Sequence, residues 1–201
     1  MKTLLFAGAA LAFAAAGFAQ SQTPNTTRTQ TNANSSVVTS SGSEDIEFVL
    51  DAAQGGLAEV ELGKLAAQRA QNDDVKKFAQ RMVDDHTKAN EQLKKIADSK
   101  SIKLPTEVDS KDKALMQRLE KLNGAAFDRT YMNAMVNDHT KDVSEFKREA
   151  NAGRDPQVKS FAESTLPTLE EHLQQAKTTR GTTSSTRTSS TTKSPAANAN
   201  N

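Results

Sequence analysis

The sequence contains no cysteine, so the chain has no disulfide, no thiol nucleophile and no thiolate ligand for a metal. It also lacks an excess of charge of either sign, because 26 Lys and Arg residues balance 25 Asp and Glu residues. Nucleic-acid-binding domains carry a basic surface, and we therefore expect no nucleic-acid partner. Ser-His-Asp, phosphate-loop and nucleotide-binding motifs are missing too, so nothing in the sequence indicates an enzyme.

Long apolar runs are missing except at the start of the chain. A single lysine precedes an apolar run from Leu4 to Phe18, and small residues stand at Gly17 and Ala19. This pattern predicts a secretory signal peptide over residues 1–19 and a periplasmic or secreted location. The run is shorter than the roughly 20 residues of a membrane-spanning helix, although an uncleaved anchor is the alternative. We expect no integral membrane span after cleavage.

Two tracts of the remaining chain have almost no apolar residues. Residues 20–42 and 178–201 consist largely of Ser, Thr, Asn, Gln and Ala. Such tracts bury too little apolar surface to offset the loss of backbone entropy on folding, and we expect both to be disordered. One folded domain is therefore predicted over residues 43–177, a length that suits a single core.

Within this domain the apolar residues recur with the period of an α-helix. Four long helices are predicted, with a shorter helical piece in the connection between the second and the third. The expected ranges are 44–71, 74–99, 111–122 for the short piece, 125–151 and 156–177. Two tight turns and one long central connection predict an all-α, ferritin-like four-helix bundle whose long crossover contains a short helix.

The turn before the last helix has a specific expected geometry. Gly153 is predicted to take the left-handed conformation that ends many helices. Asp155 is expected to cap the next helix, and Pro156 suits its first turn.

The chain has three histidines, and two of them lie in similar heptapeptides, MVDDHTK at residues 82–88 and MVNDHTK at residues 135–141. At about 100° per residue, His86, His139 and His172 all face the core. Aligning His86 with His139 also indicates that helices 74–99 and 125–151 are copies of one unit, unless the same packing demand produced both.

Glu59 projects into the apolar face of the first helix. A rise of about 1.5 Å per residue places it and the three histidines at similar heights near the middle of the bundle. One carboxylate and three imidazoles, each from a different helix, are therefore expected to meet. Asp128, Tyr131 and Asp142 are candidates for supporting contacts, whereas Asp85 and Asp138 fall at the edges of the apolar faces and are expected to be solvated or to contact a neighbouring helix.

Two interpretations of this meeting point remain open. Glu59, His86, His139 and His172 suit a divalent transition metal such as Zn, Cu, Fe or Mn. A buried hydrogen-bond network would satisfy the same groups without an ion, and we prefer it as the simpler interpretation. The di-iron pattern of bundles requires Glu three residues before His, and those positions are occupied instead by Val83, Val136 and Leu169.

Several segments together resemble a known family. In order along the chain they are FVLDAAQGGLAEVELGKLAAQRA, VKKFAQRMVDDHTKANEQLKKIA, LNGAAFDRTYMNAMVNDHTKDVSEFKREA and VKSFAESTLPTLEEHL. They resemble the bacterial domain-of-unknown-function family four-one-four-two over residues 48–175. The resemblance implies an exported protein with a ferritin-like fold, and it brings no activity and no catalytic residues.

We therefore expect a non-enzymatic binding or structural module of the cell envelope. A metal-binding protein is the first alternative. The second is an envelope-stress or interaction module, whose partner would be another envelope protein or a second copy of the chain.

Overall fold

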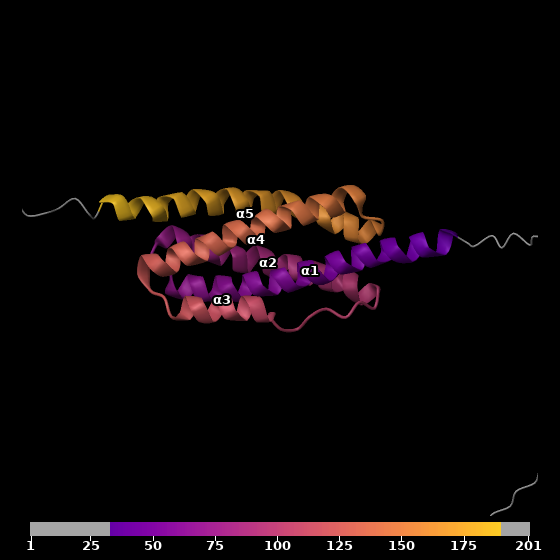
Figure 1. The fold of residues 1–201 in the computed structure, drawn as a ribbon, viewed down its shortest axis with the longest axis horizontal. Helices are drawn as coiled ribbons and strands as arrows, with labels where there is room; N and C mark the ends of the chain where they lie inside the picture. Colours follow the sequence, from indigo (N-terminus) through magenta and orange to yellow (C-terminus); the bar gives the residue numbers. More distant parts are fainter. Residues whose placement is uncertain (1–32, 190–201) are drawn as a thin grey trace, which may run out of the picture. The chain divides into compact units, whose positions relative to one another are not determined.

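The structure is a computed structural model that describes residues 33–189, with side chains described over residues 42–183. This part of the chain is entirely helical and has no strand, and its helices pack as a bundle, as predicted (Figure 1). The expected signal peptide over residues 1–19 lies outside the described residues. The five helices are α1 (Ala33–Arg69), α2 (Asp73–Ser99), α3 (Ser110–Glu120), α4 (Gly124–Ala152) and α5 (Pro156–Ser189).

Two antiparallel hairpins form the bundle, α1 with α2 and α4 with α5. The connection over residues 100–123 contains α3 and brings the chain back along the hairpin, so that α4 starts beside the α1–α2 turn (Figure 1). In the assembled bundle α1 lies next to α4, and α2 lies next to α5. This arrangement has the long crossover expected of the ferritin-like topology. Among residues 33–189, none of the helices combines the length and apolar character that crossing a membrane requires.

An aspartate ties each hairpin to the turn of the other. Asp128 of α4 accepts hydrogen bonds from the backbone N–H groups of Gln71 and Asn72, both at 2.9 Å. At the opposite end Asp45 of α1 accepts from the N–H groups of Arg154 and Asp155, at 3.2 and 2.7 Å. Asp128 was expected to support the histidines, and this expectation is wrong, because its side chain is used to satisfy backbone donors of the turn.

The two hairpins correspond to each other residue by residue at several positions. Asn72 caps α2 by accepting from the N–H groups of the residues two and three positions later, and Asp155 caps α5 in the same way. Asn72 and Asp155 are 83 positions apart, as are Asp45 and Asp128. The register continues without a gap into VKKFAQ at residues 75–80 and VKSFAE at residues 158–163.

The repeat therefore relates α1 to α4 and α2 to α5. The predicted relation of α2 to α4 has a different spacing, 53 positions between His86 and His139, and it stays a prediction. The similarity of residues 82–88 and 135–141 reflects two helix turns that both face the core, and it does not follow the register of the repeat.

Both terminal helices extend beyond the limits expected from composition. α1 begins at Ala33 and α5 continues to Ser189, so residues 33–42 and 178–189 are helical, whereas residues 20–32 and 190–201 lie outside the described residues. Once a helix has formed, each further Ser or Thr costs only about 0.5 kcal/mol relative to Ala. Thr178 also donates its hydroxyl to the carbonyl of Gln174 at 3.0 Å.

The turn between α4 and α5 differs from expectation at one residue. Gly153 has φ −55° and ψ 141°, so it is not left-handed. A Cβ atom at this position would collide with the carbonyl and the side chain of Glu149, so glycine is needed here for space. Asp155 caps α5 and Pro156 is its first residue, as predicted.

The buried apolar side chains form two clusters. One lies toward the α1–α2 turn and includes Phe78, Phe127 and Tyr131. The other lies toward the α4–α5 turn and includes Phe48 and Phe161. On each long helix one ionisable residue lies between the two clusters, and these residues are Glu59, His86, His139 and His172.

Replacing Asp128 by Ala should test the tie between the hairpins. We expect the free energy of unfolding to fall by about 3 kcal/mol, because two backbone donors lose a charged acceptor. Asp98→Ala on α2 is the control, since Asp98 is exposed and, within the part of the chain that the structure describes, its side chain pairs with Lys94 alone. This change should cost less than about 1 kcal/mol. Urea unfolding followed by circular dichroism measures both changes, and equal losses would contradict the role of Asp128.

Candidate metal centre

Each long helix contributes one ionisable side chain to the middle of the bundle, and all four are buried. Glu59 and His86 are 4% and 6% exposed, and His139 and His172 are fully buried. The three imidazole rings form a nearly equilateral triangle, with centroids separated by 5.5, 5.4 and 5.3 Å. The structure therefore brings together the four residues predicted to meet.

One nitrogen of each ring faces a group that can only accept a hydrogen bond. Nδ1 of His86 lies 2.9 Å from Oε2 of Glu59. Nδ1 of His139 lies 3.0 Å from the carbonyl oxygen of Met135, and Nε2 of His172 lies 2.9 Å from Oδ2 of Asp85. Carbonyl and ionised carboxylate oxygens have no hydrogen to give, so these three nitrogens carry the hydrogens.

The opposite nitrogen of each neutral ring then carries a lone pair. Nε2 of His139 and Nδ1 of His172 face each other at 3.4 Å, and Nε2 of His86 is buried without a hydrogen-bond partner. One nitrogen from each ring lies within 4.8 Å of one from each of the other two. Two facing lone pairs repel each other, so this position favours a proton or a metal cation between the rings.

Asp85 is the contact that sequence reasoning missed. An inter-helix role was among its expected roles, but its contact with His172 was not foreseen. Its Oδ2 accepts two hydrogen bonds, one from Nε2 of His172 on α5 at 2.9 Å and one from Nε of Arg81 at 3.2 Å. Arg81 in turn donates to Glu171 at 2.7 Å and to Gln175 at 3.0 Å, so it holds Asp85 against α5.

Electrostatics keep Glu59 ionised. Burial opposes its negative charge, but the nearby His86 and His139 outweigh this effect and lower the pKa of Glu59 to about 2. The pKa of His86 is raised, because the attraction of Glu59 exceeds the cost of burying the imidazolium. Glu59 and His86 therefore form a buried ion pair whenever His86 is protonated.

The other two histidines tend to be neutral. Burial lowers the pKa of His172 to about 4 despite its hydrogen bond to Asp85, and burial also lowers the pKa of His139. Burial opposes the charge of Asp85, yet the hydrogen bonds from His172 and Arg81 leave its pKa lowered. Neutral imidazoles are the form in which histidine binds metals.

The remaining predicted supporting residues have different positions. One carboxylate oxygen of Asp142 lies within 4.8 Å of an oxygen of Glu59 and a nitrogen of His139, so Asp142 lies next to the four central residues. Tyr131 is buried, its hydroxyl has no hydrogen-bond partner, and its pKa is raised by burial and by the charge of Glu59. Asp138 contacts none of the histidines and lies 3.9 Å from Lys111.

Comparison with known proteins places the chain in a family. The sequence profile of the domain of unknown function DUF4142 matches residues 26–179. The chain belongs to the DUF4142 family. No curated protein is significantly similar in sequence to this DUF4142 chain.

Two solved structures share the fold of this DUF4142 protein. A DUF305 fragment from Deinococcus radiodurans superposes with a TM-score of 0.62 at 15% identity, covering 69% of this chain and 96% of the fragment. A protein from Streptomyces coelicolor described as "putative secreted protein DUF305" superposes with a TM-score of 0.56 at 17% identity, covering 66% and 88%. At these identities the likeness shows the fold alone.

The charge state of the centre makes the stability of the metal-free protein depend on pH. The unfolded chain protonates His172 near 6.5, whereas the folded protein protonates it near 4. Between these values His172 binds more protons in the unfolded state, so its contribution to the free energy of unfolding falls as the pH falls from 6.5 toward 4. The lowered pKa of His139 acts in the same direction, whereas the raised pKa values of His86, Asp138 and Asp142 act in the opposite direction.

Urea unfolding at pH 7 and pH 4.5 measures this dependence, and His172 alone should contribute up to about 3 kcal/mol. We expect His172→Gln to remove this contribution and so change the slope, since the variant has no group at this position to protonate. Gln174→Ala, at an exposed position two residues further along α5, should leave the slope unchanged. A His172→Gln slope equal to that of the unmodified protein would contradict the assignment.

Proposed function

We propose that this DUF4142 protein binds one divalent transition-metal ion between His86, His139 and His172. The observation that carries the proposal is the orientation of the rings, because each has one nitrogen held by an acceptor. Of the other nitrogens, Nε2 of His86 has no partner, and those of His139 and His172 face each other at 3.4 Å. Ligating histidines in metal proteins are held in this way by a carboxylate or a carbonyl on the nitrogen that does not bind the metal. A set of imidazole ligands suits Zn, Cu, Ni or Fe.

A hydrogen-bond network without an ion explains less of the geometry. One proton shared by His139 and His172 would remove the repulsion between their facing nitrogens. It would leave Nε2 of His86 buried and unpartnered, at a cost of about 1–3 kcal/mol. A metal ion would occupy all three nitrogens at once, and we therefore favour the metal over the network preferred from the sequence.

The burial of the site supports a binding role rather than catalysis. His139 and His172 have no exposed surface, which leaves little room for a substrate beside a bound ion. The predicted signal peptide and the description of the Streptomyces coelicolor structure as a "putative secreted protein" support export. We therefore propose a non-enzymatic metal-binding module of the cell envelope.

Metal titration tests this function. Full-length protein purified without a histidine tag and treated with a chelator should bind about one equivalent of Zn²⁺ or Co²⁺, measured by calorimetry and by Co²⁺ absorption. His172→Gln should lower the affinity at least about tenfold, because one ligand is lost. Gln174→Ala, at an exposed position two residues further along α5, should not. His86→Gln provides a second ligand variant, in case either substitution unfolds the chain. Binding below about a tenth of an equivalent, or unaffected by both substitutions, would overturn the proposal.

The support of His172 by Asp85 gives a sharper test. Asp85→Asn should weaken metal binding by about 10- to 100-fold, because the amide no longer fixes the hydrogen of His172 on Nε2. Asp84→Asn is the matched control, since Asp84 is the neighbouring residue and its described contact is with Gln80 on the same helix. Equal affinities for the two variants would show that Asp85 does not orient the ligand.

A further inference from the structure

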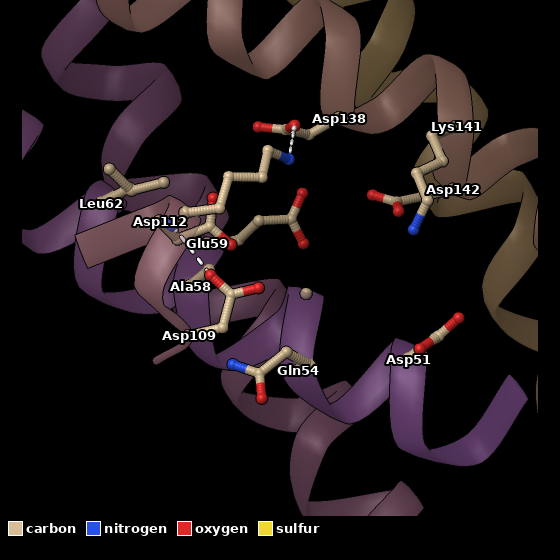
Figure 2. Close-up of a pocket in the computed structure, with 12 residues that line it drawn as sticks. Asp51, Gln54, Ala58, Glu59, Leu62, Asp109, Asp112, Asp138, Lys141 and Asp142 are labelled. Carbon is tan, nitrogen blue, oxygen red and sulfur yellow. Dashed lines mark hydrogen bonds and ion pairs between the residues drawn. The ribbon is translucent and has the colours of Figure 1, made fainter. Parts of the chain in front are cut away.

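A cavity of about 140 Å³ lies beside Glu59, between α1, α3 and α4 (Figure 2). Its lining is mainly acidic, and the carboxylates come from all three helices and from the residue that precedes α3. They are Asp51, Glu59, Asp109, Asp112, Asp138 and Asp142. An acidic lining alone does not establish a cation-binding site, because water can hydrate exposed carboxylates without any bound ion.

The second observation is a buried oxygen without a partner. Oε1 of Glu59 has no hydrogen-bond partner, and the Glu59 side chain is only 5% exposed. Nδ1 of His139 lies 3.2 Å away, but its single hydrogen is donated to the carbonyl of Met135. Figure 2 shows the Glu59 carboxylate among the lining side chains, between Asp112 of α3 and Asp142 of α4.

Asp142 faces Glu59 across the cavity, and an oxygen of each carboxylate lies within 4.8 Å of the other. The two residues are also equivalent in the internal repeat, since 83 positions separate them. The two lysines of the lining do not neutralise them. Lys141 pairs with Glu145 at 3.2 Å and Lys111 lies 3.9 Å from Asp138, and in the part of the chain described here neither forms an ion pair with Glu59 or Asp142.

We propose that this cavity binds a second cation, a divalent ion that prefers oxygen ligands, such as Ca²⁺ or Mn²⁺, between Glu59 and Asp142. Ca²⁺ binds oxygens at about 2.3–2.6 Å, so two oxygens on opposite sides of the ion lie about 5 Å apart. An oxygen of Glu59 and an oxygen of Asp142 lie within 4.8 Å of each other, which is close enough for both to bind one such ion. The remaining carboxylates of the lining and water complete the coordination.

The site is distinct from the histidine centre in its donors. Nδ1 of His139 carries the hydrogen that it donates to Met135 and so has no lone pair to offer a cation here, which leaves oxygen atoms as the ligands of the cavity. Glu59 is the residue common to both, with Oε2 on His86 and Oε1 in the cavity. This inference does not rest on the proposed function, because it requires no ion at the histidines.

Manganese binding tests the proposal. Chelator-treated, full-length His172→Gln protein, in which the histidine centre lacks a ligand, is titrated with Mn²⁺, and free Mn²⁺ is counted by electron paramagnetic resonance. We expect about one bound Mn²⁺, displaced by Ca²⁺. Introducing Asp142→Asn into the His172→Gln protein should lower its affinity for Mn²⁺ at least about tenfold. Introducing Asp84→Asn instead removes one negative charge at an exposed position and should leave the affinity for Mn²⁺ unaltered. Circular dichroism checks that each variant is folded.

Three results would overturn the second site. The first is that no protein binds Mn²⁺, and the second is that the Asp142→Asn and Asp84→Asn variants bind Mn²⁺ with equal affinity. The third is that the unsubstituted protein binds Mn²⁺ but the folded His172→Gln variant does not. The last result would place Mn²⁺ at the histidines. Zinc titration of the Asp142→Asn single variant separates the two proposals. Retained Zn²⁺ with lost Mn²⁺ in this variant supports two sites. If the unsubstituted protein binds Mn²⁺ in a way that requires Asp142 but binds no Zn²⁺, the cavity site stands and the histidine site is rejected.

Discussion

The buried pair of Glu59 and His86, joined at 2.9 Å, sets the constraint on the rest of this bundle. An ionised carboxylate in the core is costly unless it is paired and hydrogen-bonded. Glu59 is paired through one oxygen only, and the imidazoles around it each need an acceptor of their own. The structure supplies these acceptors from a carbonyl of α4 and from Asp85 of α2, and Arg81 holds Asp85 in place. The apolar clusters above and below keep water away and make each of these contacts necessary.

The internal repeat explains where the polar groups are. Hairpins α1–α2 and α4–α5 each supply one carboxylate at the same register, Glu59 and Asp142, and the bundle brings the two face to face. Bundles that hold two metal ions use a carboxylate from each of two helices and a Glu-x-x-His pair from each of the other two. This chain has the first carboxylate pair and a histidine on each of α2 and α5, but Val83 and Leu169 stand where the second glutamates would be. His139 adds a third imidazole, so nitrogen ligands gather on one side of Glu59 and oxygen ligands on the other.

Helical periodicity was sufficient to predict the bundle and the inward direction of the three histidines, because both follow from the angle and rise per residue. It could not assign partners. Asp128 does point inward, but near one end of the bundle, where the unpaired N–H groups of Gln71 and Asn72 bind its carboxylate. Asp85 leaves its helix at the edge of the core, and it reaches His172 only because α2 and α5 are neighbours. The topology of the bundle determines which helices are adjacent. The direction in which a side chain points on a single helix does not give this information.

One carboxylate connects the two proposed sites. Glu59 uses Oε2 to hold the hydrogen on Nδ1 of His86 and presents Oε1 to the acidic cavity. A cation on Oε1 would withdraw negative charge from the whole carboxylate and weaken its attraction for the hydrogen of His86. His86 would then be a poorer donor of electrons to a metal at its other nitrogen, because the basicity of a ligating imidazole depends on the acceptor behind it. Occupancy of the oxygen site and affinity of the nitrogen site are therefore linked through Glu59, and by thermodynamic reciprocity the influence runs equally in both directions.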